Sequence, residues 1–339
     1  MIYRLILALR HLAYKRGWKK SSRAAVPTIC VGNVTVGGTG KTPHTEMILR
    51  KLRFSDAWAF RNVAVLSRGY KRKTKGFQIV DPSGKASLYG DEPLQIARAF
   101  PEVTVAVDAN RVEGCERLAA DPVKADIIVL DDAFQYRKLE ATLNIVLVDY
   151  HRPVYNDKLL PWGRLRDLPS RLQEAQMVIV TKCPASPEQE ERTEWRQRLK
   201  LNASQQLFFT TISYAQPKPV FDQAADVRFT YAPRLVLVSG IANDAPLRNF
   251  LSDSYKIVRR LAFPDHHAYT RRDVRKIMSA IKEHPTACLM TTEKDAQRFR
   301  DVENIPLEIR QRLFYVPIQA QFFTPEEDEA FTETLLESL

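Results

Sequence analysis

The most informative segment of the sequence is Gly37-Gly38-Thr39-Gly40-Lys41-Thr42. It follows an apolar run, Ile29-Cys30-Val31, and precedes a segment of helical character, residues 46–52. A strand, a glycine-rich loop and a helix in this order are the context of a phosphate-binding P-loop. In such a loop, backbone N–H groups turn toward phosphate oxygens, Lys41 reaches the β- and γ-phosphates, and Thr42 holds Mg²⁺. The N-terminus of the helix adds a partial positive charge that favours a bound anion.

One position departs from the usual P-loop pattern, G-x-x-x-x-G-K-[ST], because Thr35 stands where the first glycine is expected. The alternative interpretation is a glycine-rich turn followed by a chance Gly-Lys-Thr. The strand-like and helix-like flanks favour the P-loop. The residues predicted to bind ATP are Thr35, Val36, Gly37, Gly38, Thr39, Gly40, Lys41 and Thr42.

Composition places the chain among soluble globular proteins. It has 339 residues, 45% hydrophobic and 27% charged, which is enough for a large core and two domains. The net charge of +11 indicates an anionic partner, which is nucleic acid, an anionic membrane or a phosphorylated substrate. The four cysteines form no C-x-x-C pair, so the sequence predicts a reducing compartment and no structural zinc.

Residues 1–24 are predicted to form a basic amphipathic helix at a membrane interface. Apolar residues recur at helical spacing from Ile2 to Ala13, and basic residues lie opposite and after them. No stretch reaches the roughly 18 apolar residues of a membrane span. The alternative is a helix packed on the protein's own core, and one helix can do both.

Strand-like apolar runs alternate with helix-like segments, which predicts an α/β fold with parallel sheets. The first series of runs is 28–31, 63–66, 103–107, 127–130, 144–148 and 177–180, and the second is 235–238, 255–261, 287–290 and 313–318. Residues 204–228 separate the two series and are typical of a linker of extended strands. We predict a P-loop NTPase-like parallel-sheet domain over residues 25–215. A smaller second α/β domain over residues 216–339 is expected to close over the cleft.

Two carboxylates end one of these predicted strands. Asp131 and Asp132 follow the apolar run 127–130, and a carboxylate at such a strand end holds Mg²⁺ in P-loop proteins. Doubled aspartates also begin ordinary turns. Gln135 either contacts phosphate or water or is a surface side chain.

Asp91 and His266 are candidates for proton transfer. Asp91 precedes a helix-like stretch, so it either caps that helix or acts as a general base near the transferred phosphate. His266 follows Asp265, and no further histidine or cysteine has the spacing of a metal site. A histidine beside an acid suits proton transfer at neutral pH, whereas a loop histidine that caps the next helix is the alternative.

Further candidates stand where predicted strands end, which is the edge at which open α/β sheets bind ligands. Arg68 and Tyr70 follow the run 63–66, and Arg111 follows the run 103–107. The loop of residues 160–167, which includes Arg166 and Asp167, comes after the run 144–148. This loop either faces the cleft or lies on the surface.

In this order, these segments resemble the tetraacyldisaccharide 4′-kinases, the lipid A 4′-kinases of Gram-negative bacteria. The likeness rests on residues 31–43, 66–70, 90–93, 131–135, 160–167, 239–242, 265–266 and 291–295. It covers most of the chain, and the family's loop also lacks the first P-loop glycine, so Thr35 is no objection.

The resemblance implies that the γ-phosphate of ATP is transferred to the 4′-hydroxyl of tetraacyldisaccharide 1-phosphate, giving lipid IVA. It implies ATP and Mg²⁺ as cofactors and two α/β domains around a cleft. The expected location is the cytoplasmic face of the inner membrane, as a peripheral or monotopic protein in contact with anionic lipid. No nucleic-acid or protein partner is expected.

The resemblance also assigns residues. Asp91 is similar to the family's catalytic base and His266 to its partner, acting beside Lys41. The predicted metal ligands are Thr42, Asp131, Asp132 and Asp167, and the predicted substrate or phosphate contacts are Arg68, Tyr70, Arg111, Gln135 and Arg166. Asp167 stands where a glutamate is common and Ala133 where a glycine is common, so the shorter acid is expected to reach the metal through water.

Two rival functions fit the sequence less well. A P-loop ATPase or GTPase switch needs a guanine-binding Asn-Lys-x-Asp, of which Thr181-Lys182-Cys183-Pro184 is a poor version. A nucleic-acid-binding protein needs a recognition helix or an aromatic and basic platform, whereas the positive charge here is spread along the chain outside the N-terminus.

Overall fold

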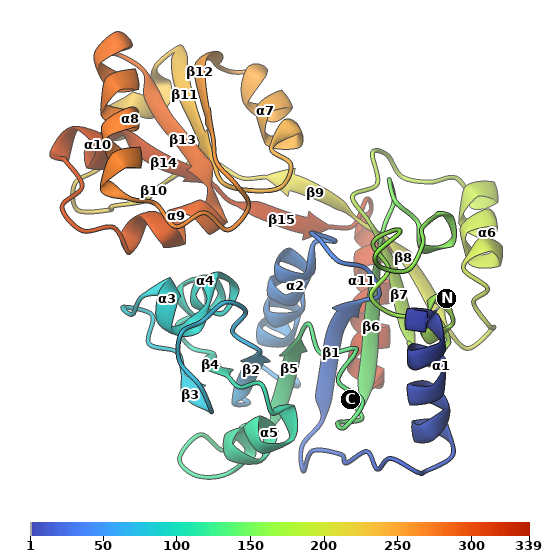
Figure 1. The fold of residues 1–339 in the computed structure, drawn as a ribbon. Coiled ribbons are helices and arrows are strands. Elements are labelled where there is room, and N and C mark those ends of the chain that lie inside the picture. The colour runs from blue at the N-terminus through green and yellow to red at the C-terminus, as the bar shows by residue number, and fades with distance from the viewer. Residues whose placement is uncertain (1) are drawn as a thin grey trace.

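The fold is a mixed α/β arrangement of two sheet-centred units, described by a computed structural model for residues 2–339. Figure 1 shows the units joined by a ribbon of two strands, β9 (Thr211–Tyr214) and β15 (Ile318–Gln321), which pair antiparallel. Residue 215, the predicted domain boundary, directly follows β9.

The first unit is built on an eight-stranded sheet in the order β3-β4-β2-β5-β1-β6-β7-β8. All neighbours are parallel except β3, which runs antiparallel to β4. The strands are β1 (Thr28–Asn33), β2 (Val63–Ser67), β3 (Gln78–Ile79), β4 (Thr104–Val107), β5 (Ile127–Asp131), β6 (Leu143–Asp149), β7 (Met177–Thr181) and β8 (Gln206–Phe209). β1, β2, β5 and β7 are buried along their whole length, which explains why continuous apolar runs predicted them.

Helices cover both faces of this sheet. The helices are α1 (Ile2–Lys15), α2 (Lys41–Phe54), α3 (Ala86–Tyr89), α4 (Asp91–Ala99), α5 (Arg111–Ala119), α6 (Gln189–Arg198) and α11 (Pro325–Glu337). Side chains of α2, α4 and α11 share one hydrophobic core with the sheet, and those of α5 and α6 share the core on its other face. None of the helices in residues 2–339 has both the length and the apolar content of a membrane span.

The second unit is a five-stranded sheet in the order β10-β14-β13-β11-β12. Its strands are β10 (Lys218–Pro219), β11 (Arg234–Ser239), β12 (Lys256–Ala262), β13 (Cys288–Thr292) and β14 (Leu313–Val316). Its helices are α7 (Ala245–Ser252), α8 (Arg271–Glu283), α9 (Glu293–Arg300) and α10 (Leu307–Arg312). Short 3₁₀ turns occur in both units, at Val154–Asn156 and Pro169–Glu174 in the first and at Val227–Tyr231 in the second.

The last helix departs from the predicted arrangement. Residues 216–339 were assigned to the second domain, yet α11 packs its Phe331 and Leu335 into the core of the first sheet. The chain returns there through β15, and the reason is burial: both side chains are fully buried in that core. The second sheet unit therefore ends before β15.

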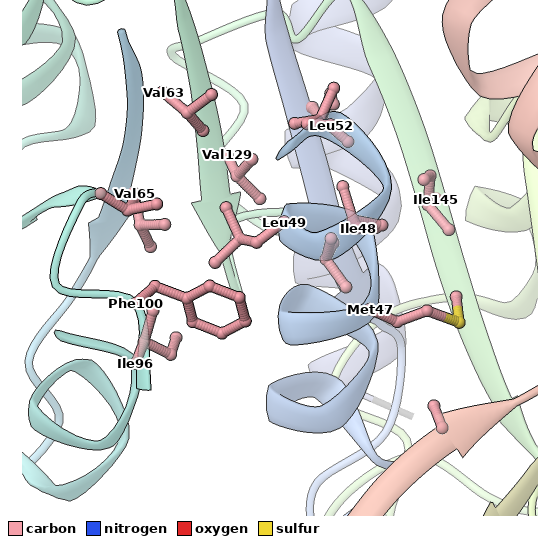
Figure 2. Close-up of a cluster of buried hydrophobic side chains, with 14 of the residues drawn as sticks. Met47, Ile48, Leu49, Leu52, Val63, Val65, Ile96, Phe100, Val129 and Ile145 are labelled. Atoms are coloured by element: carbon pink, nitrogen blue, oxygen red, sulfur yellow. The ribbon is translucent and has the colours of Figure 1, made fainter. Parts of the chain in front are cut away.

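The core beneath α2 holds the glycine-rich loop in place. Figure 2 shows Met47, Ile48, Leu49 and Leu52 of α2 directed toward side chains of the sheet and of α4. Because α2 begins directly after the loop, packing along this helix fixes where the loop lies relative to the strands.

Replacing Leu49 by alanine is expected to lower the free energy of unfolding by about 2–5 kcal/mol, because the fully buried side chain would leave a cavity. The midpoint of urea unfolding measures the change. Leu9→Ala is the matched control, because Leu9 is 56% exposed on α1. Equal midpoints for the two variants would contradict the packing of α2 on the sheet.

Candidate active site

The glycine-rich loop connects β1 to α2. Gly37 and Gly40 adopt φ angles of 103° and 89°, in the left-handed region that favours glycine. Gly40 is the N-cap of α2 and offers no side-chain cap, so the first N–H groups of the helix stay available to an anion. Lys41 is the first residue of α2.

Neighbouring elements restrain this loop. The Asn33 side chain donates to Thr39 Oγ1 at 2.6 Å, and Thr181 Oγ1 donates to the Thr39 carbonyl at 2.9 Å. Lys182 Nζ contacts the Gly38 carbonyl and pairs with Asp149. The ends of β1, β6 and β7 therefore hold the loop in one shape before any ligand binds.

Asp131 and Asp132 lie beside Lys41. Lys41 Nζ is 3.7 Å from Asp132 Oδ2, and Arg166 also pairs with Asp132. Burial opposes ionisation of Asp132, but Lys41 and Arg166 hold its pKa below the ordinary value. Asp131 is buried and accepts a hydrogen bond from Ser67 Oγ at 3.0 Å. Its burial, reinforced by the charges of Glu92 and Asp132, raises the pKa of Asp131 to about 6.

These groups fit a magnesium ion that is shared with a nucleotide. Within residues 2–339, no three His, Cys, Asp or Glu side chains form a metal cluster. Mg²⁺ usually takes one or two carboxylates and fills its remaining positions with phosphate oxygens and water. Asp131 meets that need, because burial and the nearby charges of Glu92 and Asp132 both disfavour its negative charge, and a bound cation would offset this.

Arg166 and Gln135 meet at Asn33. Arg166 contacts the Asn33 side chain, and Gln135 Nε2 donates to the Asn33 carbonyl at 2.6 Å. Gln135 thus supports the end of β1, while its Oε1 is buried without a hydrogen-bond partner.

Asp167 does not join Asp131 and Asp132. Its buried carboxylate is 2.6 Å from His11 Nε2, and its other oxygen lies 3.5 Å from Arg171. The neighbouring Arg166 points the other way, toward Asp132. The physical reason is that His11 of α1 and Arg171 supply the hydrogen-bonding and ionic partners that this buried carboxylate needs. The predicted role as a metal ligand is therefore corrected to a docking contact of α1.

Asp91 and His266 meet across the two units. His266 Nδ1 is 3.2 Å from Asp91 Oδ2, and Tyr70 packs edge-on against the His266 ring at a centroid distance of 5.6 Å. Asp91 does not cap α4, because neither it nor Gly90 makes a side-chain cap. Although burial opposes it, hydrogen bonds from His266 and Arg298 hold the pKa of Asp91 below the ordinary value.

Glu92 links the two halves of the site. Its carboxylate lies 2.5 Å from Lys294 Nζ. The positive charges of Lys294 and Lys41 hold the pKa of Glu92 below its ordinary value. Glu92 in turn raises the pKa of Asp131. Through Glu92, the charges around Asp91 and those around Lys41 therefore influence one another.

The remaining predicted contacts separate into two groups. Arg68 and Tyr70 are exposed after β2 and are free to meet a ligand. Arg111 is buried, and its guanidinium donates to the Asp108 carbonyl and, at 3.3 Å, to the Asp131 carbonyl. Arg111 therefore braces the end of β5.

Sequence reasoning missed Arg298 and His11. Arg298 donates to Asp91 from a position 207 residues later, and His11 reaches Asp167 from 156 residues earlier. The one local signal for Arg298 is its i,i+3 spacing from Asp295, with which it pairs at 2.8 Å. That spacing is equally common on ordinary helix surfaces.

Comparisons with known proteins agree on one family. The family model described as tetraacyldisaccharide-1-P 4'-kinase matches residues 1–339. The tetraacyldisaccharide 4'-kinase of Parabacteroides distasonis is 42% identical over 332 residues, covering 95% of this chain and 88% of that protein. The enzyme of the same name from Flavobacterium johnsoniae is 38% identical and covers 97% and 92%.

A solved structure is similar along the whole chain. The crystal structure of the "apo" form of LpxK from Aquifex aeolicus, in complex with ATP, superposes with a TM-score of 0.74 at 25% sequence identity. The match covers 99% of this chain and 96% of that one.

Proposed function

Because the chain belongs to the tetraacyldisaccharide-1-P 4'-kinase family, we propose that Asp91, His266 and the loop around Lys41 carry out its phosphoryl transfer. The enzyme uses ATP to phosphorylate the 4′-hydroxyl of tetraacyldisaccharide 1-phosphate in lipid A biosynthesis. The observation that carries the residue assignment is the 3.2 Å contact of His266 Nδ1 with Asp91 Oδ2. This contact joins a carboxylate and an imidazole from different units, beside a loop suited to phosphate.

Asp91 accepts the proton of the attacking hydroxyl. A sugar hydroxyl is a poor nucleophile at neutral pH, so removal of its proton as the new P–O bond forms lowers the barrier. Asp91 is ionised at neutral pH, because its pKa is held low. His266 fixes the carboxylate through Oδ2, so Oδ1 is the oxygen that would accept the proton.

The loop and its neighbours bind the triphosphate of ATP. The N–H groups of Val36 and Thr39 donate to the Arg164 and Gly37 carbonyls, so other backbone N–H groups of residues 35–42 would bind the phosphates. Lys41 offsets charge on the transferred phosphoryl group. Thr42 and Asp131 would hold Mg²⁺, with Asp132 nearby, and the ion would neutralise charge on the β- and γ-phosphates. Arg166 keeps Asp132 in place through their ion pair.

A transfer assay tests these assignments. Radiolabelled ATP and tetraacyldisaccharide 1-phosphate are incubated with the enzyme in detergent micelles, and lipid-bound label is counted. We expect label at the 4′ position with the native enzyme and almost none with Asp91→Asn. Normal transfer by a folded Asp91→Asn enzyme would remove Asp91 as the base.

We also propose that α1 holds the enzyme on an anionic lipid surface. Five apolar side chains of α1 face solvent: Ile2, Leu5, Ile6, Leu9 and Leu12. The docked face is mainly polar, because Tyr3 donates to the Arg166 carbonyl, Arg10 to the Gln135 carbonyl, and His11 contacts Asp167. Leu7 is the one apolar side chain of α1 that is buried. A helix that serves only a protein core shows the reverse pattern. An apolar face flanked by lysine and arginine matches an interfacial helix.

Replacing Leu5, Ile6 and Leu9 together by glutamine is expected to weaken binding to anionic vesicles by at least 10-fold. Each buried aliphatic side chain contributes about 1.5–3 kcal/mol, while the docked face stays intact. Vesicle co-sedimentation measures the binding, and calorimetry with ATP is the control, since Lys41 is untouched. High salt should also weaken binding of the native protein. Unchanged co-sedimentation of the triple variant would refute the membrane role of α1.

A further inference from the structure

One face of α9 is polar and lies against α3 and α4 of the first unit (Figure 1). Its contacts come from Lys294, Gln297 and Arg298 and from Asp301, which directly follows the helix. This i, i+3, i+4, i+7 spacing places the four residues on one side of the helix. The second unit therefore meets the first through hydrogen bonds and ion pairs aimed at Glu92, Arg98, Asp91 and the N-terminus of α3.

Arg298 reaches the proposed base from this face. Its Nε and Nη2 donate to Asp91 Oδ2 at 2.8 and 2.6 Å. His266 Nδ1 contacts the same oxygen at 3.2 Å. All three contacts converge on Oδ2, and no hydrogen bond within residues 2–339 occupies Oδ1.

Arg298 is itself held firmly. Its Nη1 donates to the Gly240 carbonyl at 3.0 Å and to Asp295 Oδ1 at 2.8 Å. Asp295 is fully buried and accepts from the Gly240 N–H at 2.9 Å and from Thr292 Oγ1 at 2.6 Å. Only 6% of Arg298 is exposed, so its guanidinium has little freedom to turn away.

We propose that Arg298 is a positioning residue that the second unit supplies to the first, holding Asp91 by Oδ2 so that Oδ1 alone accepts the proton of the sugar hydroxyl. This inference rests on the proposed role of Asp91 as the base. A planar guanidinium with two parallel donors fixes a carboxylate in orientation as well as in charge. Contact of α9 with the first unit then brings Arg298 to Asp91 and orients the carboxylate for proton transfer.

The contrasting explanation is that Arg298 only fastens the two units together. The two explanations differ in what happens to the acidity of Asp91. Charged groups around Asp91 come from several elements: Glu92 on α4, Arg298, Lys294 and Asp295 on α9, and His266 and Asp265 before α8. Among them, Arg298 and His266 lower the pKa of Asp91. Loss of Arg298 should therefore raise this pKa.

The experiment compares Arg298→Gln and Arg298→Lys with the native enzyme across pH. We expect Arg298→Gln to lower kcat roughly 100-fold, because a carboxylate displaced by about an ångström loses that much. KM for ATP should change little, because Arg298 does not contact the loop. The acid limb of kcat/KM, which reports the free base, should move to higher pH. Arg298→Lys keeps the charge, so its limb should stay low while kcat falls less.

Asp301→Asn is the matched control, because Asp301 belongs to the same polar face and binds the α3 N–H groups without touching Asp91. A similar fall in kcat for Asp301→Asn and Arg298→Gln, with the acid limb unmoved in both, would overturn the proposal in favour of simple docking. The proposal would also be overturned if both Arg298 variants kept the native kcat and the native acid limb of kcat/KM. Asp91→Asn is assayed in parallel. Native activity in that variant would refute the role of Asp91 as the base, and with it the inference about Arg298.

Discussion

Lys41→Ala is expected to lower kcat for phosphate transfer roughly 100- to 1,000-fold while the protein stays folded. Lys41 is the only predicted cation in the glycine-rich loop, and its Nζ lies 3.7 Å from Asp132 at the carboxyl edge of the sheet. Its loss leaves charge on the transferred phosphoryl group without that partner. The fold should survive, because Asp132 keeps its ion pair with Arg166. Initial rates with labelled ATP and thermal melting measure the two effects.

Lys51→Ala on the same helix is the matched control. Lys51 pairs with Asp328 of α11 at 2.8 Å and lies over the Phe322 ring, so it serves packing between α2 and the C-terminal segment. We expect a lower melting temperature and a kcat near that of the native enzyme. Near-native turnover in a well-folded Lys41→Ala enzyme would remove Lys41 from the mechanism.

Six strands of the first sheet were predictable because their signals are local, whereas β3 and β8 were not among the predicted strand runs of this sheet. Each parallel strand buried on both faces leaves a continuous apolar run, as Ile127–Asp131 does in β5, and each run stands beside a helical segment. β9 and β15 were not predicted as a pair. They are short, half-exposed and separated by more than a hundred residues, so nothing local marks them as partners. The placement of α11 likewise depends on which core its Phe331 reaches.

The same distinction applies to the site. Lys41, Asp131 and Asp132 were predicted to serve one phosphate and its Mg²⁺, and in the structure Lys41 Nζ lies 3.7 Å from Asp132 Oδ2. Arg298 and His11 act across long sequence separations, which leave no periodic pattern. Asp167 was misplaced because its buried carboxylate contacts His11, which lies 156 residues earlier in the sequence, whereas the neighbouring Arg166 pairs with Asp132.

Asp91→Asn and His266→Asn should each lower kcat by roughly 100- to 10,000-fold, the range of a lost general base. Asparagine suits both positions. At residue 91, asparagine keeps a side-chain oxygen that accepts from Arg298. Alanine would remove this acceptor and leave the buried Arg298 with Asp295 as its one carboxylate partner. At residue 266 the backbone has a φ of 60°, a conformation that asparagine tolerates better than most residues.

The double variant decides whether the two residues act as one unit. Since His266 works by contacting the carboxylate at 3.2 Å, it has little to contribute once Asp91 can no longer accept a proton. The double variant should then be little slower than Asp91→Asn alone, far short of the product of the two single losses. Rates are measured at saturating ATP and lipid, with melting curves to confirm folding. Multiplicative losses would show that His266 acts on a different group, such as Tyr70 or the substrate itself, and the shared proton-accepting role of the pair would have to be abandoned.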